Sequence, residues 1–293
     1  MKHRAGFVNI VGNPNVGKST IMNALVGEKI SIITSKSQTT RHRIMGIVNG
    51  DDFQIVYSDT PGVIKPVYQL QKSMLNFSRS ALEDADILLY VTDLVEKPDK
   101  NKDYLKAVKE AGMPVILIIN KIDLGNQQQL EQLVEEWKNK LPDAEILPVS
   151  ALHNFNIDKL LKRIRELLPE SPPYFEKDQL TDKSERFFVT EIIREKILLN
   201  YQKEVPYAVE PEVEEFKRNG DIIRIKTLIH VERDSQKGIL IGKKGAALKK
   251  IGIQARKDLE DFFGTKIHLE LFVKVSKDWR EKHNMLRSFG YEQ

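Results

Sequence analysis

The first part of the chain alternates short apolar runs with stretches in which apolar side chains recur every three or four positions. The runs predict buried strands, and the recurring spacing predicts helices that bury one face. The expected strands are residues 6–11, 43–49, 53–58, 86–92, 114–119 and 145–149. The expected helices are residues 18–26, 68–83, 101–111, 127–139 and 156–168. This alternation predicts an α/β fold, with a mostly parallel sheet covered by helices on both faces.

A different order of elements follows a proline-rich break at Pro169, Pro172 and Pro173. The pattern there predicts a helix, a strand pair, a long helix, a strand and a short terminal helix. The expected elements are a helix at 184–201, strands at 209–217 and 222–231 joined through Arg218-Asn219-Gly220, a helix ending near Phe263 and a strand at 266–275. We therefore predict an α/β domain over 1–170, a linker over 171–182 and a smaller α+β domain over 183–293.

The amino-acid composition bears on the cellular location of the protein and on the kinds of site that it can contain. The chain has 293 residues and no cysteine, which excludes disulfides and thiolate metal sites. Absence of cysteine is consistent with a reducing cytosol, so we expect a cytoplasmic protein. No apolar run approaches the roughly 20 residues that span a bilayer.

The net charge of +4 is unevenly distributed. Positive and negative residues cancel over 1–181, so the whole excess lies in 182–293. Within that half, residues 235–257 hold seven positive residues and no acidic one: Lys237, Lys243, Lys244, Lys249, Lys250, Arg256 and Lys257. Such a stretch favours binding of a polyanion, although a solvated surface is the alternative explanation.

Residues 12–19 form a complete G-x-x-x-x-G-K-S motif between an expected strand and an expected helix. A glycine-rich turn that opens a helix points several backbone N–H groups at one spot, which attracts phosphate. Lys18 would reach the β- and γ-phosphates, and the Ser19 hydroxyl would bind Mg²⁺. The residues expected around the phosphates are Gly12, Asn13, Pro14, Asn15, Val16, Gly17, Lys18, Ser19 and Thr20. Because this loop occupies the place of a cleavable leader, we expect no signal peptide.

A D-x-x-G motif, Asp59-Thr60-Pro61-Gly62, follows the strand at 53–58. An acidic residue at this place can hold Mg²⁺ through water, and the N–H of Gly62 can contact a γ-phosphate. The motif alone is weak evidence, because it is short and common. It becomes informative because it follows a strand downstream of the phosphate loop.

The segment Asn120-Lys121-Ile122-Asp123 indicates which base is bound. The carboxylate of Asp123 can accept hydrogen bonds from the ring N–H and the exocyclic amine of guanine, a donor pair that adenine lacks. Lys121 would lie along the base, and Asn120 would tie this loop to the phosphate loop. In Ser150-Ala151-Leu152, the N–H of Ala151 would face the guanine oxygen.

Assembled in chain order, these motifs resemble a Ras-like GTPase domain. The segment Gln38-Thr39-Thr40-Arg41-His42-Arg43 lies where such domains keep switch I, and Thr40 is the expected Mg²⁺ ligand there, with Thr39 as the alternative. Together with Asp59–Val63 and the second domain, it resembles the Era family of bacterial GTPases. The likeness runs from Gly6 to Tyr291. It implies binding of GTP and GDP with Mg²⁺ and GTP hydrolysis that involves Lys18, Thr40 and Gly62.

Two positions bear on the rate of hydrolysis. Val63 stands where Ras-type proteins keep a water-orienting glutamine, so we expect slow intrinsic hydrolysis. Resemblance to the Era-related group implies that Asn15 helps to coordinate a monovalent cation such as K⁺; a turn-forming residue beside Pro14 is the alternative. Arg41 and Arg43 would either act as an arginine finger in cis or lie solvated or against a partner.

The segment from Ile239 to Leu248 contains I-G-x-x-G-x-x-L, which resembles the signature of the K-homology (KH) RNA-binding fold in its type II form. The glycines let the backbone approach a nucleic-acid strand, and the lysines neutralise phosphates. The alternative is a helix-turn-helix corner that carries basic side chains on its surface. The resemblance implies RNA contacts by Ile241, Gly242, Lys243, Lys244, Gly245, Lys249 and Lys250.

By the same resemblance, the partner is the 3′ end of 16S ribosomal RNA, and the role is assembly of the 30S small ribosomal subunit. Peripheral attachment to the inner membrane also belongs to the resemblance, and we expect a monomer. The basic and apolar segment 277–289 would lie on a membrane surface or, as we prefer, pack on its own domain. Two other function classes compete: a nucleotide kinase or ATPase, and a non-catalytic RNA-binding assembly factor for which GTP is only a structural ligand.

Overall fold

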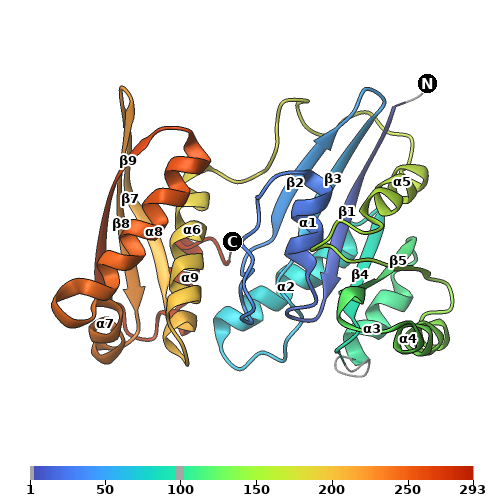
Figure 1. Cartoon of the computed structure of the whole chain (residues 1–293), viewed down its shortest axis with the longest axis horizontal. Helices are drawn as coiled ribbons and strands as arrows, with labels where there is room; N and C mark the ends of the chain where they lie inside the picture. The colour runs from blue at the N-terminus through green and yellow to red at the C-terminus, as the bar shows by residue number, and fades with distance from the viewer. Residues whose placement is uncertain (1–2, 97–101, 293) are drawn as a thin grey trace. The chain divides into compact units, whose positions relative to one another are not determined.

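The computed structural model describes residues 3–96 and 102–292 (Figure 1). These residues form two compact units. The first unit comprises Met1–Val67 and Gln71–Asp182, and the second comprises Tyr68–Leu70 and Lys183–Gln293.

The first unit is built on a six-stranded sheet in the order β2-β3-β1-β4-β5-β6. Only β2 runs antiparallel to its neighbour. The strands are β1 (Arg4–Gly12), β2 (Ile44–Asn49), β3 (Phe53–Asp59), β4 (Ile87–Asp93), β5 (Val115–Asn120) and β6 (Glu145–Pro148). The helices are α1 (Lys18–Val26), α2 (Gln69–Glu83), α3 (Lys102–Glu110), α4 (Gln127–Lys140) and α5 (Ile157–Leu167). The predicted α/β class is confirmed; residue 101, the expected start of a helix, lies outside the described residues.

The sheet is covered on both faces. One apolar cluster joins β1, β4 and β5 to α2, α3 and α4, with Trp137 buried against Tyr90 at a ring-centroid distance of 5.5 Å. The remaining helices α1 and α5 contact one another on the other face (Figure 1). Because β1, β3, β4 and β5 are parallel, their carboxyl ends lie at one edge, where ligands bind in such sheets. Gly12, Asp59, Asp93 and Asn120 end these four strands.

The second unit has a three-stranded sheet in the order β7-β8-β9. Its elements are α6 (Glu185–Asn200), β7 (Glu210–Asn219), β8 (Ile222–Val231), α7 (Asp234–Ile241), α8 (Ala246–Phe263), β9 (Lys266–Val275) and α9 (His283–Ser288). Helices α6, α7 and α8 bury their apolar side chains against one face of the sheet. This α+β arrangement confirms the predicted class of the second domain.

Two local predictions in the second unit were wrong. Helix α7 was not predicted, because Gly238 and the polar residues before it weaken the helical pattern. The hairpin turn lies at Gly220-Asp221 rather than at Arg218-Asn219-Gly220, because β7 continues to Asn219. Gly220 has a φ of 57°, which suits the tight turn.

The segment 171–182, expected as a linker, is hydrogen-bonded to the first unit. The carboxamide of Gln54, a fully buried residue of β3, lies at the centre of the first set of bonds. Its nitrogen donates to the carbonyl oxygen of Phe175 at 2.8 Å. Its oxygen accepts from the backbone N–H groups of Tyr174 at 2.7 Å and Phe175 at 3.0 Å. One buried side chain therefore replaces the strand partner that these backbone groups lack.

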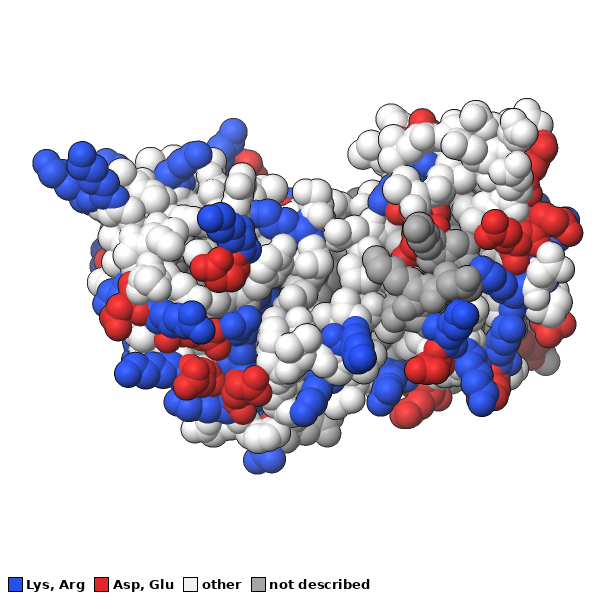
Figure 2. All heavy atoms as spheres, turned by 90° about the horizontal axis from the view of Figure 1, so that it is seen from below, with Lys and Arg blue, Asp and Glu red and all other residues white. Residues whose placement is uncertain are grey.

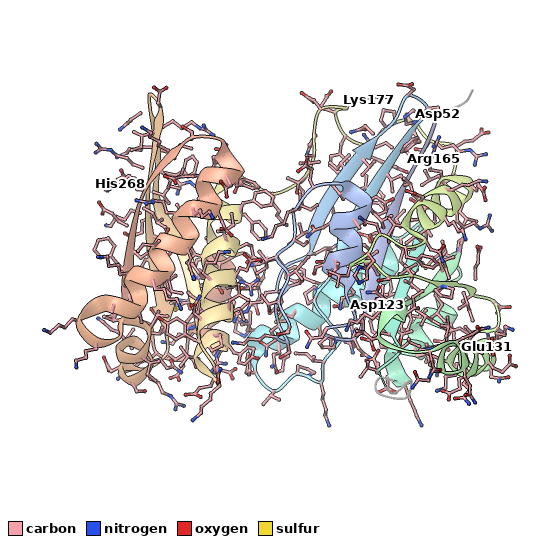
Figure 3. All side chains as sticks on the ribbon, in the orientation of Figure 1. Asp52, Asp123, Glu131, Arg165, Lys177 and His268 are labelled. Carbon is pink, nitrogen blue, oxygen red and sulfur yellow. The ribbon has the colours of Figure 1, made fainter. Side chains whose placement is uncertain are left out.

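The same segment then runs beside β2. The backbone N–H of Ile47 donates to the carbonyl of Leu180 at 2.8 Å, and the hydroxyl of Thr181 donates to the carbonyl of Met45 at 2.6 Å. Lys177, labelled in Figure 3, donates to the carbonyl of Gly50 at 2.9 Å. The edge strand β2, which directly follows the expected switch I, is thereby paired along its free side.

We predict that Gln54→Leu releases this segment. The substitution keeps the buried volume but leaves three backbone groups without partners, so it should cost about 2 kcal/mol or more of unfolding free energy. Amide hydrogen exchange at Tyr174 and Phe175 should accelerate. The matched control is Gln127→Leu, because Gln127 is exposed on α4 and its carboxamide nitrogen donates to the neighbouring Glu131 at 2.8 Å. Unchanged exchange at residues 174 and 175 in Gln54→Leu would contradict the prediction.

Candidate nucleotide-binding and nucleic-acid-binding sites

A cavity of about 440 Å³ lies at the carboxyl edge of the first unit's sheet. It is lined by the phosphate loop, by residues between Ile32 and Thr40, and by Gly62 and Lys121. A side chain at Gly62 would bring its Cβ within 2.6 Å of Pro14 Cα, so only glycine allows the two loops to approach this closely. The D-x-x-G turn and the phosphate loop therefore form two walls of one cavity.

The ammonium group of Lys18 is held inside this cavity. It donates to the carbonyl oxygens of Gly12 at 3.1 Å and Asn13 at 2.8 Å. Burial lowers the pKa of Lys18 to about 8, although the charge of Asp59 acts in the opposite direction. The side chain is thus positioned by the loop and ready to carry a charge beside anionic groups.

Ser19, Thr40 and Asp59 converge on one point. The Ser19 hydroxyl donates to Asp59 Oδ2 at 2.6 Å, the Thr40 hydroxyl donates to the same oxygen at 3.2 Å, and the two hydroxyl oxygens are 2.9 Å apart. Asp59 is fully buried, and burial raises its pKa against the hydrogen bond from Ser19 and the charge of Lys18. In the part of the chain that the structure describes, Asp59 Oδ1 accepts no hydrogen bond.

This donor set suits Mg²⁺, which prefers hydroxyl, carboxylate and water oxygens. An unsatisfied buried carboxylate oxygen beside two hydroxyl groups is what an Mg²⁺ ion with its waters would complete. Thr40, the first expectation from the sequence, lies in this group. Thr39 instead shares a 2.6 Å hydrogen bond with the Thr34 hydroxyl and donates to the carbonyl of Lys36 at 2.6 Å.

The loop after β5 contains the expected base-recognition carboxylate, Asp123 (Figure 3). The Ser150 hydroxyl donates to Asp123 Oδ1 at 2.5 Å, and this bond lowers the pKa of Asp123. Asn120 donates to the carbonyl of Val16 at 2.9 Å and so ties this loop to the phosphate loop. The N–H of Ala151, expected to face the guanine oxygen, donates to Asn120 Oδ1 at 3.1 Å. Leu152 is exposed.

Lys121 is positioned by a residue that the sequence analysis missed. Its ammonium donates to Asp93 Oδ2 at 2.6 Å and to the carbonyl of Asn15 at 2.5 Å. Asp93 ends β4 and pairs in register with Asn120 at the end of β5. An acidic residue at the carboxyl end of a predicted parallel strand was the available indication of this role.

Three residues of the expected nucleotide set, Thr60, Pro61 and Val63, make contacts within the first unit. The Thr60 hydroxyl donates to the carbonyl of Ile10 at 2.7 Å, and the carbonyl of Pro61 accepts from Ser78 at 2.7 Å. Val63 is buried in the apolar cluster beneath α2, α3 and α4, and its N–H donates to the carbonyl of Gly12 at 3.2 Å. Its side chain points into the core, so it takes no part in orienting water.

Asn15 contacts the segment that precedes the expected switch I. Its φ of 67° is left-handed, and its carboxamide nitrogen donates to the carbonyl of Ser35 at 3.0 Å. The segment around Ser35 lines the cavity but was not singled out from the sequence, because it contains no motif. Arg43 is neither solvated nor extended toward the cavity. Asp84 accepts two hydrogen bonds from it, so in this structure its guanidinium group is paired inside the first unit.

In the second unit, the G-x-x-G turn connects α7 to α8. Gly242 has a φ of 72°, and a Cβ there would lie 2.6 Å from the Cβ of Ala247. Lys243 and Lys244 at the tip are exposed, as are Lys249 and Lys250 on α8. Figure 2 shows a projecting group of Lys and Arg side chains at its left end, whereas both signs of charge are mixed over most of the visible surface.

An apolar groove lies beside this turn. It has a volume of about 300 Å³, and its walls include Leu248 and Ile253 of α8 and Leu269 and Leu271 of β9. Exposed lysines next to a groove with apolar walls are what binding of a single-stranded nucleic acid requires. The lysines at the turn would contact its phosphates, and the groove would hold its bases.

The C-terminal segment packs on its own unit. Trp279 and Leu286 are fully buried, and the Trp279 indole N–H donates to the carbonyl of Ala208 at 2.9 Å. This agrees with the preferred interpretation from the sequence. Within residues 3–96 and 102–292, no helix is long and apolar enough to cross a membrane.

Comparisons with known proteins agree with both sites. Residues 7–121 match the family described as 50S ribosome-binding GTPase, and residues 204–280 match the KH domain. GTPase Era of Geotalea daltonii is 47% identical over 290 residues, which cover 98% of each chain. GTPase Era of Staphylococcus epidermidis is 42% identical over 292 residues, which cover 99% of this chain and 98% of the relative.

Two solved structures share the whole fold. An Aquifex aeolicus Era variant bound to GDP and AlF4⁻ and an Era complex with MgGDPNP and nucleotides 1506–1542 of 16S ribosomal RNA each have a TM-score of 0.95 and 41% identity. Each comparison covers 99% of this chain and 100% of the solved chain. The chain therefore belongs to the Era family of GTPases, which bind guanine nucleotide with Mg²⁺.

Proposed function

We propose that this GTPase binds the single-stranded 3′ end of 16S ribosomal RNA in the groove beside Gly242–Gly245 and assists assembly of the 30S subunit. The observation that carries the proposal is the exposed Lys243-Lys244 turn next to an apolar groove. The 16S fragment bound by an Era structure 41% identical to this chain supports the same partner. Family membership favours hydrolysis of GTP over a purely structural role for the nucleotide.

The first unit binds GTP at the cavity of the phosphate loop. Asp123, kept ionised by the hydrogen bond from Ser150, accepts hydrogen bonds from the ring N–H and the exocyclic amine of guanine. Asn120 and Lys121 hold the loop after β5, which carries Asp123, against the phosphate loop. Lys18 places its charge on the β- and γ-phosphates. These contacts bind and orient the substrate but do not by themselves activate water.

Hydrolysis depends on neutralising the charge that develops on the phosphates. Ser19, Thr40 and Asp59 would hold Mg²⁺, which supplies positive charge to the β- and γ-phosphate oxygens. The backbone N–H of Gly62 would donate a hydrogen bond to the γ-phosphate. Because Val63 lies in the core, this chain has no side chain at that position to orient the attacking water, and intrinsic hydrolysis is slow.

A monovalent cation would supply further charge in this arrangement. Asn15 belongs to the phosphate loop, and its carboxamide nitrogen donates to the carbonyl of Ser35 at 3.0 Å. The contact brings a carboxamide group, with its own oxygen, and a backbone carbonyl oxygen from two loops close together. Both are ligands that K⁺ accepts. We propose that Asn15 and this carbonyl help to hold K⁺ beside the phosphates in the GTP-bound protein.

Membrane attachment is not part of the function that we propose. The apolar anchors that an interfacial helix needs, Trp279 and Leu286, are buried in the second unit. The exposed residues of this segment are polar.

Binding of GDP should take up a proton near pH 8. The free protein holds Lys18 with a pKa of about 8, and phosphates favour its charged form. At pH 8 about half a proton should be taken up per GDP, and affinity should fall as pH rises above 8, approaching tenfold per unit. Calorimetry in two buffers of different ionisation enthalpy measures the uptake. At pH 7 the uptake due to Lys18 should drop to ~0.1 proton; equal uptake at both pH values would refute the assignment.

Stimulation by K⁺ should depend on Asn15. The wild-type protein should hydrolyse GTP roughly tenfold or more faster in KCl than in NaCl of equal ionic strength, and Asn15→Ala should remove the difference. The matched control is Asn154→Ala, since Asn154 also has a positive φ, 54°, but does not line the cavity. Identical rates of wild-type protein in the two salts would exclude the cation site.

RNA binding should depend on the G-x-x-G turn and not on the nucleotide site. Gly242→Asp should abolish binding of a 16S 3′-end oligonucleotide while leaving GDP affinity intact, because the added side chain strains the turn and repels phosphates. Gly220→Asp is the matched control, with a φ of 57° in an open hairpin turn.

A second pair of variants separates charge from shape. Replacing Lys243 and Lys244 together by alanine should reduce the slope of log affinity against log salt by about 0.7 per lysine. The corresponding change of Lys106 and Lys109 on α3 should leave the slope unchanged. Wild-type RNA affinity in Gly242→Asp would mean that RNA binds another surface.

A further inference from the structure

Arg43 lies at the end of the expected switch I, three residues after Thr40 and one before β2. All three nitrogens of its guanidinium group are engaged. Two donate to the carboxylate of Asp84, at 2.6 and 2.9 Å, and Nε donates to the Ser58 hydroxyl at 2.7 Å. One of the two also donates to Asn9 Oδ1 at 3.2 Å. The side chain is 11% exposed.

The partners of Arg43 come from three different elements of the first unit. Asn9 lies on β1, Ser58 lies on β3 directly before Asp59, and Asp84 directly follows α2. Asn9 completes the network, because its carboxamide nitrogen donates to Asp84 Oδ1 at 2.7 Å and to the carbonyl of Ala81 at 2.8 Å. A two-pronged arginine–carboxylate pair fixes orientation as well as distance, so the guanidinium group is held rigidly.

This anchoring bears on the position of Thr40. The ladder between β2 and β3 begins with Ile44 opposite Asp59, so regular backbone pairing holds the chain only from Ile44 onward. Upstream of that residue, side-chain contacts hold the chain, and Arg43 is the first of them. A displacement of about 1 Å at a reacting group can cost 10²-fold in rate.

We propose that Arg43 is a positioning residue for GTP hydrolysis, which keeps the Thr40 hydroxyl beside Ser19 and Asp59 through its contacts with Asp84, Ser58 and Asn9. Because Asp84 directly follows α2 and neutralises the guanidinium charge, Arg43 also links the end of that helix to the switch. The proposal rests on the function proposed for Thr40 as a ligand of Mg²⁺.

The experiment separates positioning from folding. GDP binding uses the phosphate loop and Asn120–Asp123 but not Thr40. Arg43→Ala should therefore slow single-turnover GTP hydrolysis about 10- to 100-fold and raise the Mg²⁺ concentration for half-maximal rate. It should weaken binding of a non-hydrolysable GTP analogue but change GDP affinity less than about twofold.

Three further variants sharpen the result. Arg43→Lys should remain slow, because an ammonium group cannot form the two-pronged pair. Free guanidinium ion at millimolar concentration should partly restore Arg43→Ala but not Arg43→Lys. Asp84→Asn, which preserves shape if Arg43→Ala fails to fold, should show the same split between hydrolysis and GDP binding. Arg163→Ala is the control, since Arg163 pairs with Glu145 and Glu166 on the surface.

The outcomes are distinguishable. Slow hydrolysis with normal GDP affinity supports the proposal. A wild-type rate in Arg43→Ala, or a parallel loss of hydrolysis and GDP affinity, overturns it. Thr40→Ala tests the function on which it rests: if that variant hydrolyses GTP normally, the assignment of Thr40 fails, whereas a slow Thr40→Ala with a normal Arg43→Ala rejects only the role of Arg43.

Discussion

A carboxylate that is fully removed from water needs partners, and at Asp59 they come from separate parts of the first unit. Ser19 reaches it from the first turn of α1, and Thr40 reaches it from the segment before β2. The parallel pairing of β3 with β1 places Asp59 beside the phosphate loop. Because losing any one partner would leave a buried charge poorly satisfied, this carboxylate holds the phosphate loop, the switch and the sheet in one arrangement.

Much of this arrangement could be predicted from the sequence, because the motifs follow strands whose carboxyl ends must meet at one edge of a parallel sheet. The pairing of Asp59 with Ser19 and the link from Asn120 to the phosphate loop belong to that class. Contacts made by side chains that belong to no motif could not be predicted. Asp84 gives no sign of its pairing with Arg43, and Gly238 conceals a helix that tertiary packing stabilises.

The charged groups of the two binding sites differ in their exposure to solvent. In the first, charge is concentrated in a buried cavity, where low polarity strengthens each contact and shifts the pKa of Lys18 and Asp59. In the second, the lysines stand in solvent, where each contributes little alone and salt screens them. Discrimination of the nucleotide is therefore a matter of fixed geometry, whereas attraction of RNA is additive and tuned by ionic strength.

Because of the hydrogen bonds along residues 171–182, most of the segment between the units is not a free linker. A free chain of that length would let the RNA-binding unit explore a wide volume. Because Thr181 and Asp182 are bonded to Met45 on β2, only Lys183 separates the bonded chain from Ser184, the cap of α6. The covalent connection between the units is therefore far shorter than the segment that the sequence predicts as a linker.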